Sequence, residues 1–121
     1  MEKKVEEQFL YDIYGELLTE KQKLILDYYY NDDYNLAEIA ELVHVTRQGV
    51  YDSVKRSKST METYEKKLGL LQRFLRERAL LNESIGEIAE LLEAESVKKD
   101  AALHSELTKI QGRLMKISEN N

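Results

Sequence analysis

The chain has 121 residues, a formal net charge of −5, no cysteine and no proline, and 42% of its residues are hydrophobic. This length predicts one domain, with room for a helical extension, and the apolar content is enough for a core. The lack of cysteine excludes disulfides and thiolate metal sites, and no run approaches the roughly 20 apolar residues of a membrane span.

The composition predicts an all-α fold. Leucine, glutamate, lysine and alanine are abundant, the five glycines are scattered, and no series of alternating β-branched runs would build a sheet or a wing. The first ten residues, MEKKVEEQFL, are charged and lack the apolar core of a secretory signal. We therefore expect a soluble cytoplasmic protein.

Two helices are predicted before residue 34. Residues 3–18 carry a broad apolar stripe, which we interpret as core. Thr19 and Gln22 are spaced as a capping box for the second helix, and the turn residues at 31–33 end it. The tyrosine run at 28–30 could stack on bases, but its spacing favours packing within the helix bundle.

Residues 35–56, NLAEIAELVHVTRQGVYDSVKR, read as two helices joined by a tight turn, the layout of a helix-turn-helix. Asn35 and Glu38 are spaced as a capping box for the first helix. His44 lies in the turn and is a residue type that tolerates positive φ. Thr46 is a good N-cap for the second helix, whose valines at 50 and 54 should point inward.

The residues that remain on the outer face of this second helix have side chains that can hydrogen-bond to DNA bases. Arg47 can donate two hydrogen bonds to guanine, and Gln48 can pair with adenine in the same bidentate way. Both lie in the first turn of the second helix, the part that such motifs insert into the major groove. The candidate DNA-binding residues are Thr46, Arg47, Gln48, Tyr51, Lys55, Arg56 and Lys58.

The charge distribution supports this placement. Residues 1–45 hold 4 basic and 11 acidic side chains, residues 46–78 hold 9 and 4, and residues 79–121 hold 5 and 8. DNA binding depends on local positive surface that meets phosphates, and here the basic excess begins at the proposed reading helix. The alternative to DNA binding is that these residues form a solvated polar face on an ordinary helical hairpin.

The second half of the chain should form long helices. After the reading helix the chain either continues as helix or restarts at Ser59, and Ser84 with Glu87 is spaced as a further capping box. A last helix over about 97–118 carries a heptad seam, which we interpret as a homodimer interface. The candidate dimerisation residues are Leu103, Leu107, Ile110, Leu114 and Ile117. The predicted domains are 1–58, the helix-turn-helix, and 59–121, the helical extension.

Residues with catalytic or metal-binding spacing are missing from the sequence. The two histidines are far apart, and no phosphate-cradling glycine loop, HExxH motif or Ser/His/Asp arrangement is present. We therefore expect no enzyme activity, no metal and no cofactor.

The run LTEKQKLILDYYYNDDYNLAEIAELVHVTRQGVYDSVKRS resembles region four of bacterial sigma factors, where a helix pair precedes a promoter-reading helix-turn-helix. More narrowly, the motifs YGELLTEKQ, LAEIAE and RQGVYD are similar to the YlxM family of small bacterial proteins, over roughly residues 5–92. In that family Ala is common where this chain has Gly49.

The resemblance to the YlxM family implies an all-helical cytoplasmic protein that binds double-stranded DNA and takes part in the signal recognition particle pathway. It also leaves a second reading open. In that reading the protein is an accessory factor that contacts the protein or RNA of the signal recognition particle, without reading DNA sequence.

Overall fold

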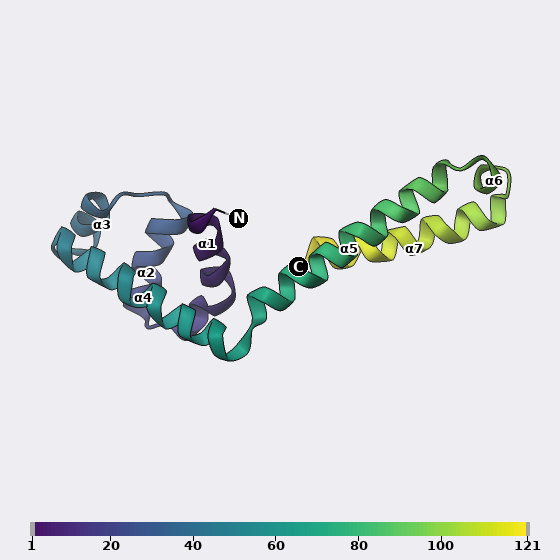
Figure 1. The fold of residues 1–121 in the computed structure, drawn as a ribbon. Helices are drawn as coiled ribbons and strands as arrows, with labels where there is room; N and C mark the ends of the chain where they lie inside the picture. Colours follow the sequence, from purple (N-terminus) through teal and green to yellow (C-terminus); the bar gives the residue numbers. More distant parts are fainter. Residues whose placement is uncertain (1, 121) are drawn as a thin grey trace. The chain divides into compact units, whose positions relative to one another are not determined.

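A computed structural model describes residues 2–120, which form helices and their connections without a strand in this range (Figure 1). The elements in chain order are α1 (Lys3–Tyr14), the 3-10 helix η1 (Gly15–Leu17), α2 (Glu20–Leu26), the π-helix η2 (Asp27–Asn31), α3 (Leu36–Val43), α4 (Arg47–Leu68), α5 (Leu70–Glu93), α6 (Glu95–Lys98) and α7 (Ala101–Asn120). The predicted all-α class is confirmed.

The chain divides into two units, an N-terminal unit that ends at Leu71 and a C-terminal unit that begins at Gln72. The domain boundary expected between residues 58 and 59 falls inside α4, which runs without a break to Leu68. Of the two alternatives left open by the sequence, a helix that restarts at Ser59 and one that continues, the structure has the continuous helix. A C′ glycine, Gly69, in the left-handed conformation at φ 63° ends α4.

The core of the N-terminal unit lies where α1, α2 and α3 pack against α4. The apolar stripes read from the sequence supply it, because residues three and four apart share one face of a helix. The buried apolar side chains of this unit are Leu10, Tyr11, Tyr14, Leu18, Ile25, Leu26, Tyr30, Ile39, Ala40, Val50, Val54, Met61 and Leu71. Tyr30, from the tyrosine run, packs inside the bundle.

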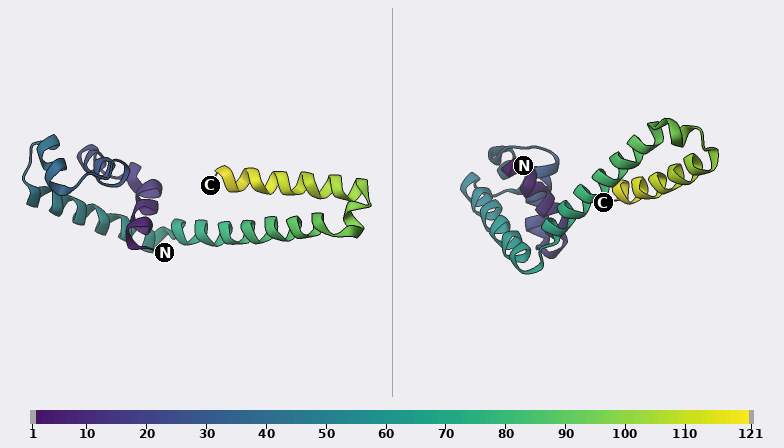
Figure 2. Two further views of the ribbon diagram at one scale, coloured as in Figure 1. Left: turned by 90° about the horizontal axis from the view of Figure 1, so that it is seen from above. Right: turned by 45° about the vertical axis from the view of Figure 1, so that its right-hand side comes forward.

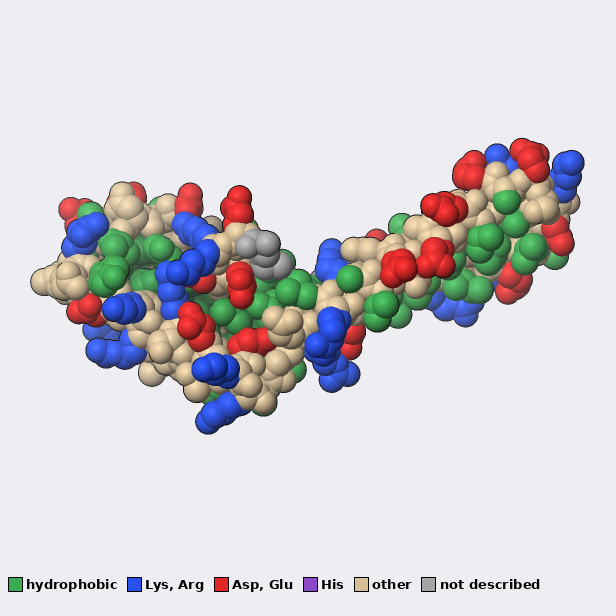
Figure 3. Space-filling view, in the orientation of Figure 1, with side chains coloured by type: hydrophobic (Ala, Val, Ile, Leu, Met, Phe, Trp, Pro, Cys, Tyr) green, Lys and Arg blue, Asp and Glu red, His purple; other side chains and the backbone are tan. Residues whose placement is uncertain are grey.

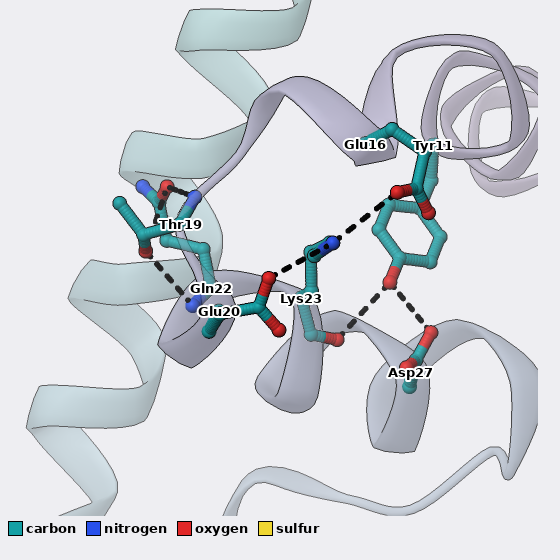
Figure 4. Close-up of polar contacts among 7 residues, drawn as sticks. All are labelled: Tyr11, Glu16, Thr19, Glu20, Gln22, Lys23 and Asp27. Atoms are coloured by element: carbon teal, nitrogen blue, oxygen red, sulfur yellow. Dashed lines mark hydrogen bonds and ion pairs between the residues drawn. The ribbon is translucent and has the colours of Figure 1, made fainter.

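Local hydrogen bonds fix the starts of the predicted helices. The Thr19 hydroxyl accepts from the Gln22 backbone N–H at 3.2 Å, and the Gln22 side chain accepts from the Thr19 N–H at 3.0 Å (Figure 4). Together they satisfy backbone donors that the first turn of a helix cannot pair internally. This capping box is confirmed.

The first two helices end differently from the expectation. The predicted helix over 3–18 is α-helical only to Tyr14, and the segment before Asp32 widens into the π-helix. Tyr11 connects the two helices: its hydroxyl donates to Asp27 Oδ1 at 2.5 Å and lies 3.0 Å from the Lys23 carbonyl oxygen (Figure 4). Burial, followed by the bond to Asp27, raises the pKa of the Tyr11 hydroxyl.

A second tyrosine holds the junction between α4 and α5. The Tyr14 hydroxyl donates to Glu65 Oε1 at 2.6 Å and accepts from the Leu70 N–H at 3.3 Å. The same Glu65 oxygen accepts from the Leu71 N–H at 2.9 Å. Two of the unpaired amides at the start of α5 are thus satisfied by side chains of the N-terminal unit.

The C-terminal unit is a helical hairpin in which α5 and α7 run side by side, with the short α6 at the tip (Figures 1 and 2). The Arg78 guanidinium of α5 donates to the Ser118 carbonyl oxygen of α7 at 3.2 Å. The helix start predicted at Ser84 is wrong, because Ser84 lies within the unbroken α5. The last helix, expected over 97–118, spans residues 101–120 as α7.

Candidate nucleic-acid interface

The segment from α3 to α4 has the predicted helix-turn-helix form. The Asn35 side chain accepts from the Glu38 N–H at 2.9 Å, and the Glu38 side chain accepts from the Asn35 N–H at 3.0 Å, which confirms the second capping box. His44 then turns the chain at φ 58°, the left-handed conformation predicted for this position. The Thr46 hydroxyl accepts from the Gly49 N–H at 2.9 Å and caps α4.

The inner face of α4 anchors the second helix of the motif. Val50 is fully buried and Val54 nearly so, as predicted, and Ser57 and Met61 continue the buried stripe. This stripe recurs every three or four residues, so the opposite face of the helix is turned outward. The rotation of α4 about its own axis is therefore set by the core.

The outer face of α4 carries the side chains proposed from the sequence. Five of them, Arg47, Gln48, Tyr51, Lys55 and Arg56, are exposed, whereas Lys58 is only half-exposed. Lys and Arg side chains gather along the lower-left edge of the N-terminal unit, where α4 runs (Figure 3). The predicted residues thus lie on an accessible surface.

Four of the predicted residues line grooves on two flanks of α4. One flank borders a groove of about 410 Å³ that Tyr51, Lys55 and Lys58 share with Lys3 of α1. The other borders a groove of about 480 Å³ that includes Arg56. Its remaining lining residues are Thr19, Lys21, Gln22, Ile25, Val45, Gly49, Asp52 and Ser53.

Two lysines at these grooves were missed by sequence reasoning. Lys3 and Lys21 come from helices outside the motif, and no local pattern around them marks them as neighbours of α4. Only the tertiary packing brings them there. They place two further positive charges at the grooves, whose linings also include the acidic residues Glu7, Glu62 and Asp52.

Lys58 has a structural partner that its sequence position did not reveal. Its ammonium lies 3.1 Å from Oε2 of Glu7, a carboxylate that is almost completely buried and also accepts from the Tyr30 hydroxyl at 3.3 Å. The same ammonium lies 5.6 Å from the centre of the Tyr29 ring. Lys58 therefore ties α4 to α1 and η2, in addition to its place at the groove.

A hydrogen bond within α4 engages one of the side chains that were predicted to contact DNA bases. The Gln48 side-chain amide donates to Asp52 Oδ1 at 3.1 Å, one turn further along α4. Because both side chains are exposed, this bond is of the weak kind that water or another polar partner can replace. Asp52 also puts a negative charge among the basic side chains.

The five predicted dimerisation residues lie on α7, but not on one equivalent surface. Leu107 and Leu114 are half-buried, whereas Leu103, Ile110 and Ile117 are exposed.

Among the described residues no cluster of three His, Asp or Glu side chains could hold a metal ion, and none of the described helices has the length and apolar character to cross a membrane.

The fold and this surface define an all-α protein with a helix-turn-helix whose second helix presents an exposed polar face. Residues 1–107 match the family model UPF0122, described as "Putative helix-turn-helix protein, YlxM / p13 like". The chain belongs to this family, which confirms the resemblance drawn from its motifs.

Relatives in the same family span most or all of the chain. A UPF0122 protein of Acetivibrio thermocellus is 38% identical over 120 residues, which cover 99% of this chain and 100% of the relative. UPF0122 proteins of Geobacillus sp. (strain WCH70) and of Listeria welshimeri are 47% and 45% identical over 83 and 91 residues. Those matches cover 69% and 75% of this chain and 76% of each relative.

Proposed function

We propose that this protein is a cytoplasmic DNA-binding regulator that inserts the first two turns of α4 into the major groove of double-stranded DNA. The observation that carries the proposal is the rotation of α4, because its buried valines leave Arg47, Gln48 and Tyr51 exposed together at the start of the helix. That is the part of a helix-turn-helix that contacts base edges. Lys55 and Arg56 follow on the same helix and are suited to phosphates.

The proposal is tested by selecting bound sequences from a random duplex pool at two salt concentrations. We expect one preferred sequence, and an affinity that falls with salt at a log–log slope of roughly −0.9 for each phosphate contact. On that sequence Arg47→Ala and Gln48→Ala should each weaken binding by about 1–3 kcal/mol. Lys98→Ala, a lysine of α6 in the other unit, serves as control and should leave the affinity unchanged.

The proposed regulator is a homodimer that uses the C-terminal unit. Of the five residues predicted as contacts, Leu103, Ile110 and Ile117 are exposed, whereas Leu107 and Leu114 are half-buried within the hairpin. Dimeric helix-turn-helix proteins bind two half-sites about one helical turn apart. A selected sequence with two related halves at that spacing would support this part of the proposal. A single short site bound by one chain would contradict it.

A second proposal is that the protein is an accessory factor of the signal recognition particle and contacts its protein or RNA. Asp52 favours the protein contact within this second proposal, since an exposed carboxylate beside Gln48 opposes a close approach of nucleic-acid phosphates. Pull-down of the particle that survives Arg47→Ala, combined with failure of every duplex in the random pool to compete with heparin, would select this function over DNA reading.

A further inference from the structure

The C-terminal unit does not bury enough apolar surface to form a core of its own. Among the side chains described between residues 72 and 119, only Val97 is buried. A unit of fifty residues buries only a small share of its surface on folding, so it is marginally stable without a further partner. We therefore expect a second surface to cover the exposed apolar residues of this hairpin.

The heptad seam of α7 is divided between two neighbours. Leu107 and Leu114 are half-buried on the stripe that leads to Ser118, whose carbonyl oxygen bonds to Arg78 of α5. This stripe faces α5 of the same hairpin. The other three seam residues recur every seven positions and remain 43%, 40% and 49% exposed; they are Leu103, Ile110 and Ile117.

Helix α5 extends this exposed row across the hairpin. Leu80 is 64% and Leu91 49% exposed, and their eleven-residue spacing puts them on one face of the helix. Leu80 and Ile117 also line one groove of about 300 Å³ with Glu77, Leu81 and Ser84, which shows that the two rows lie on the same side. We name Leu80, Leu91, Leu103, Ile110 and Ile117 the hairpin face.

The two edges of the hairpin face carry opposite charges. Residues 77–93 of α5 include five glutamates and one arginine, whereas residues 101–118 of α7 include three basic residues and one glutamate. In Figure 3, acidic side chains lie along α5 and around the tip of the hairpin, and apolar side chains lie beside them. A surface with this layout is complementary to itself after rotation by a two-fold axis parallel to the helices.

We propose that the hairpin face binds the hairpin face of a second copy of this chain, with α5 against α7 of the partner, to form an antiparallel four-helix bundle. A two-fold axis along the bundle brings acidic α5 onto basic α7, whereas a perpendicular axis would place like charges together. The chosen axis puts the first residues of both α5 helices at one end of the bundle. This geometry deepens the homodimer named in the proposed function.

Sedimentation equilibrium of the full chain at several concentrations, without nucleic acid, tests the surface. We expect a dimer that Ile110→Glu weakens at least about tenfold, because a carboxylate would be buried without a partner. Met115→Glu is the matched control, since Met115 lies on another face of α7 and is 44% exposed against 40% for Ile110. A monomeric wild type, or equal dissociation of the two variants, would overturn the proposal.

The arrangement of the helices is tested with single cysteines, since the chain contains none of its own. Leu80→Cys and Ile117→Cys chains of different tag length are mixed, allowed to exchange subunits, and oxidised with copper phenanthroline. Because a disulfide needs Cα atoms about 4.4–6.8 Å apart, we expect the mixed-length product and little of either same-length product. Rapid self-linking of the Leu80→Cys chain would place α5 against α5 and refute the arrangement.

The results of the sedimentation and cross-linking experiments do not depend on whether the protein binds DNA. Arg47→Ala should weaken binding to the preferred sequence and leave the dimer intact if both proposals hold. A dimer without any DNA preference would leave the hairpin face standing and remove only the regulator.

Discussion

Replacement of Tyr14 by phenylalanine tests the junction between α4 and α5. The substitution keeps the buried ring and removes only the hydroxyl, which bonds to Glu65 Oε1 at 2.6 Å and to the Leu70 N–H at 3.3 Å. A bond to a charged group contributes about 1.5–3 kcal/mol, and the Leu70 N–H loses an acceptor. We expect Tyr14→Phe to lower the free energy of unfolding by about 2–3 kcal/mol.

Thermal unfolding followed by circular dichroism measures this loss. For a unit of this size it corresponds to a fall in Tm of roughly 8–24 °C. Tyr34→Phe is the control, because Tyr34 is 37% exposed and its replacement should change stability by less than about 0.5 kcal/mol. A Tyr14→Phe protein as stable as the control would show that the Glu65 contact does not hold the junction.

The pH dependence of the same variant gives a second readout. Burial, followed by the hydrogen bond to Glu65, raises the pKa of Tyr14 above its ordinary value of 10.0. A raised folded-state pKa means that the stabilisation is complete below pH 10 and is lost as the pH rises through the folded value. The stability difference between wild type and Tyr14→Phe should therefore shrink as the pH rises above 10; a constant difference would contradict the argument.

Two further substitutions separate local from tertiary contributions. Thr46→Ala removes the cap of α4 and should cost about 1 kcal/mol in chemical denaturation, whereas an unchanged midpoint would mean that water replaces the cap. Lys58→Met leaves the nearly buried Glu7 without its cation at 3.1 Å and should cost about 1–3 kcal/mol, while Lys4→Met, which breaks an exposed pair, should cost less than about 1 kcal/mol. Equal losses in the two lysine variants would refute the role of burial.

The helix-turn-helix was predictable from the sequence because its determinants are local. Capping boxes join residues three apart, and the positive φ of His44 belongs to a single residue of a suitable type. The buried valines follow from helical periodicity alone. Which helices are brought to α4 was not predictable, since the Lys58–Glu7 contact joins residues far apart in the chain.

The errors arose where one local pattern was compatible with two structures. Ser84 and Glu87 have the spacing of a cap, yet a strong helix-forming context carries α5 through them. The leucine seam of α7 showed a surface to cover, but periodicity cannot state whether the cover comes from the same chain or from a partner. The burial of Leu107 and Leu114 resolves one half of that seam.

One face of the 22-residue helix α4 packs against the core, and the opposite face forms an exposed strip. Substitutions on the strip leave Val50, Val54 and Met61 in place, so the surface can diversify while the scaffold is preserved. Relatives can thus differ at these exposed positions of α4 and still keep the same architecture.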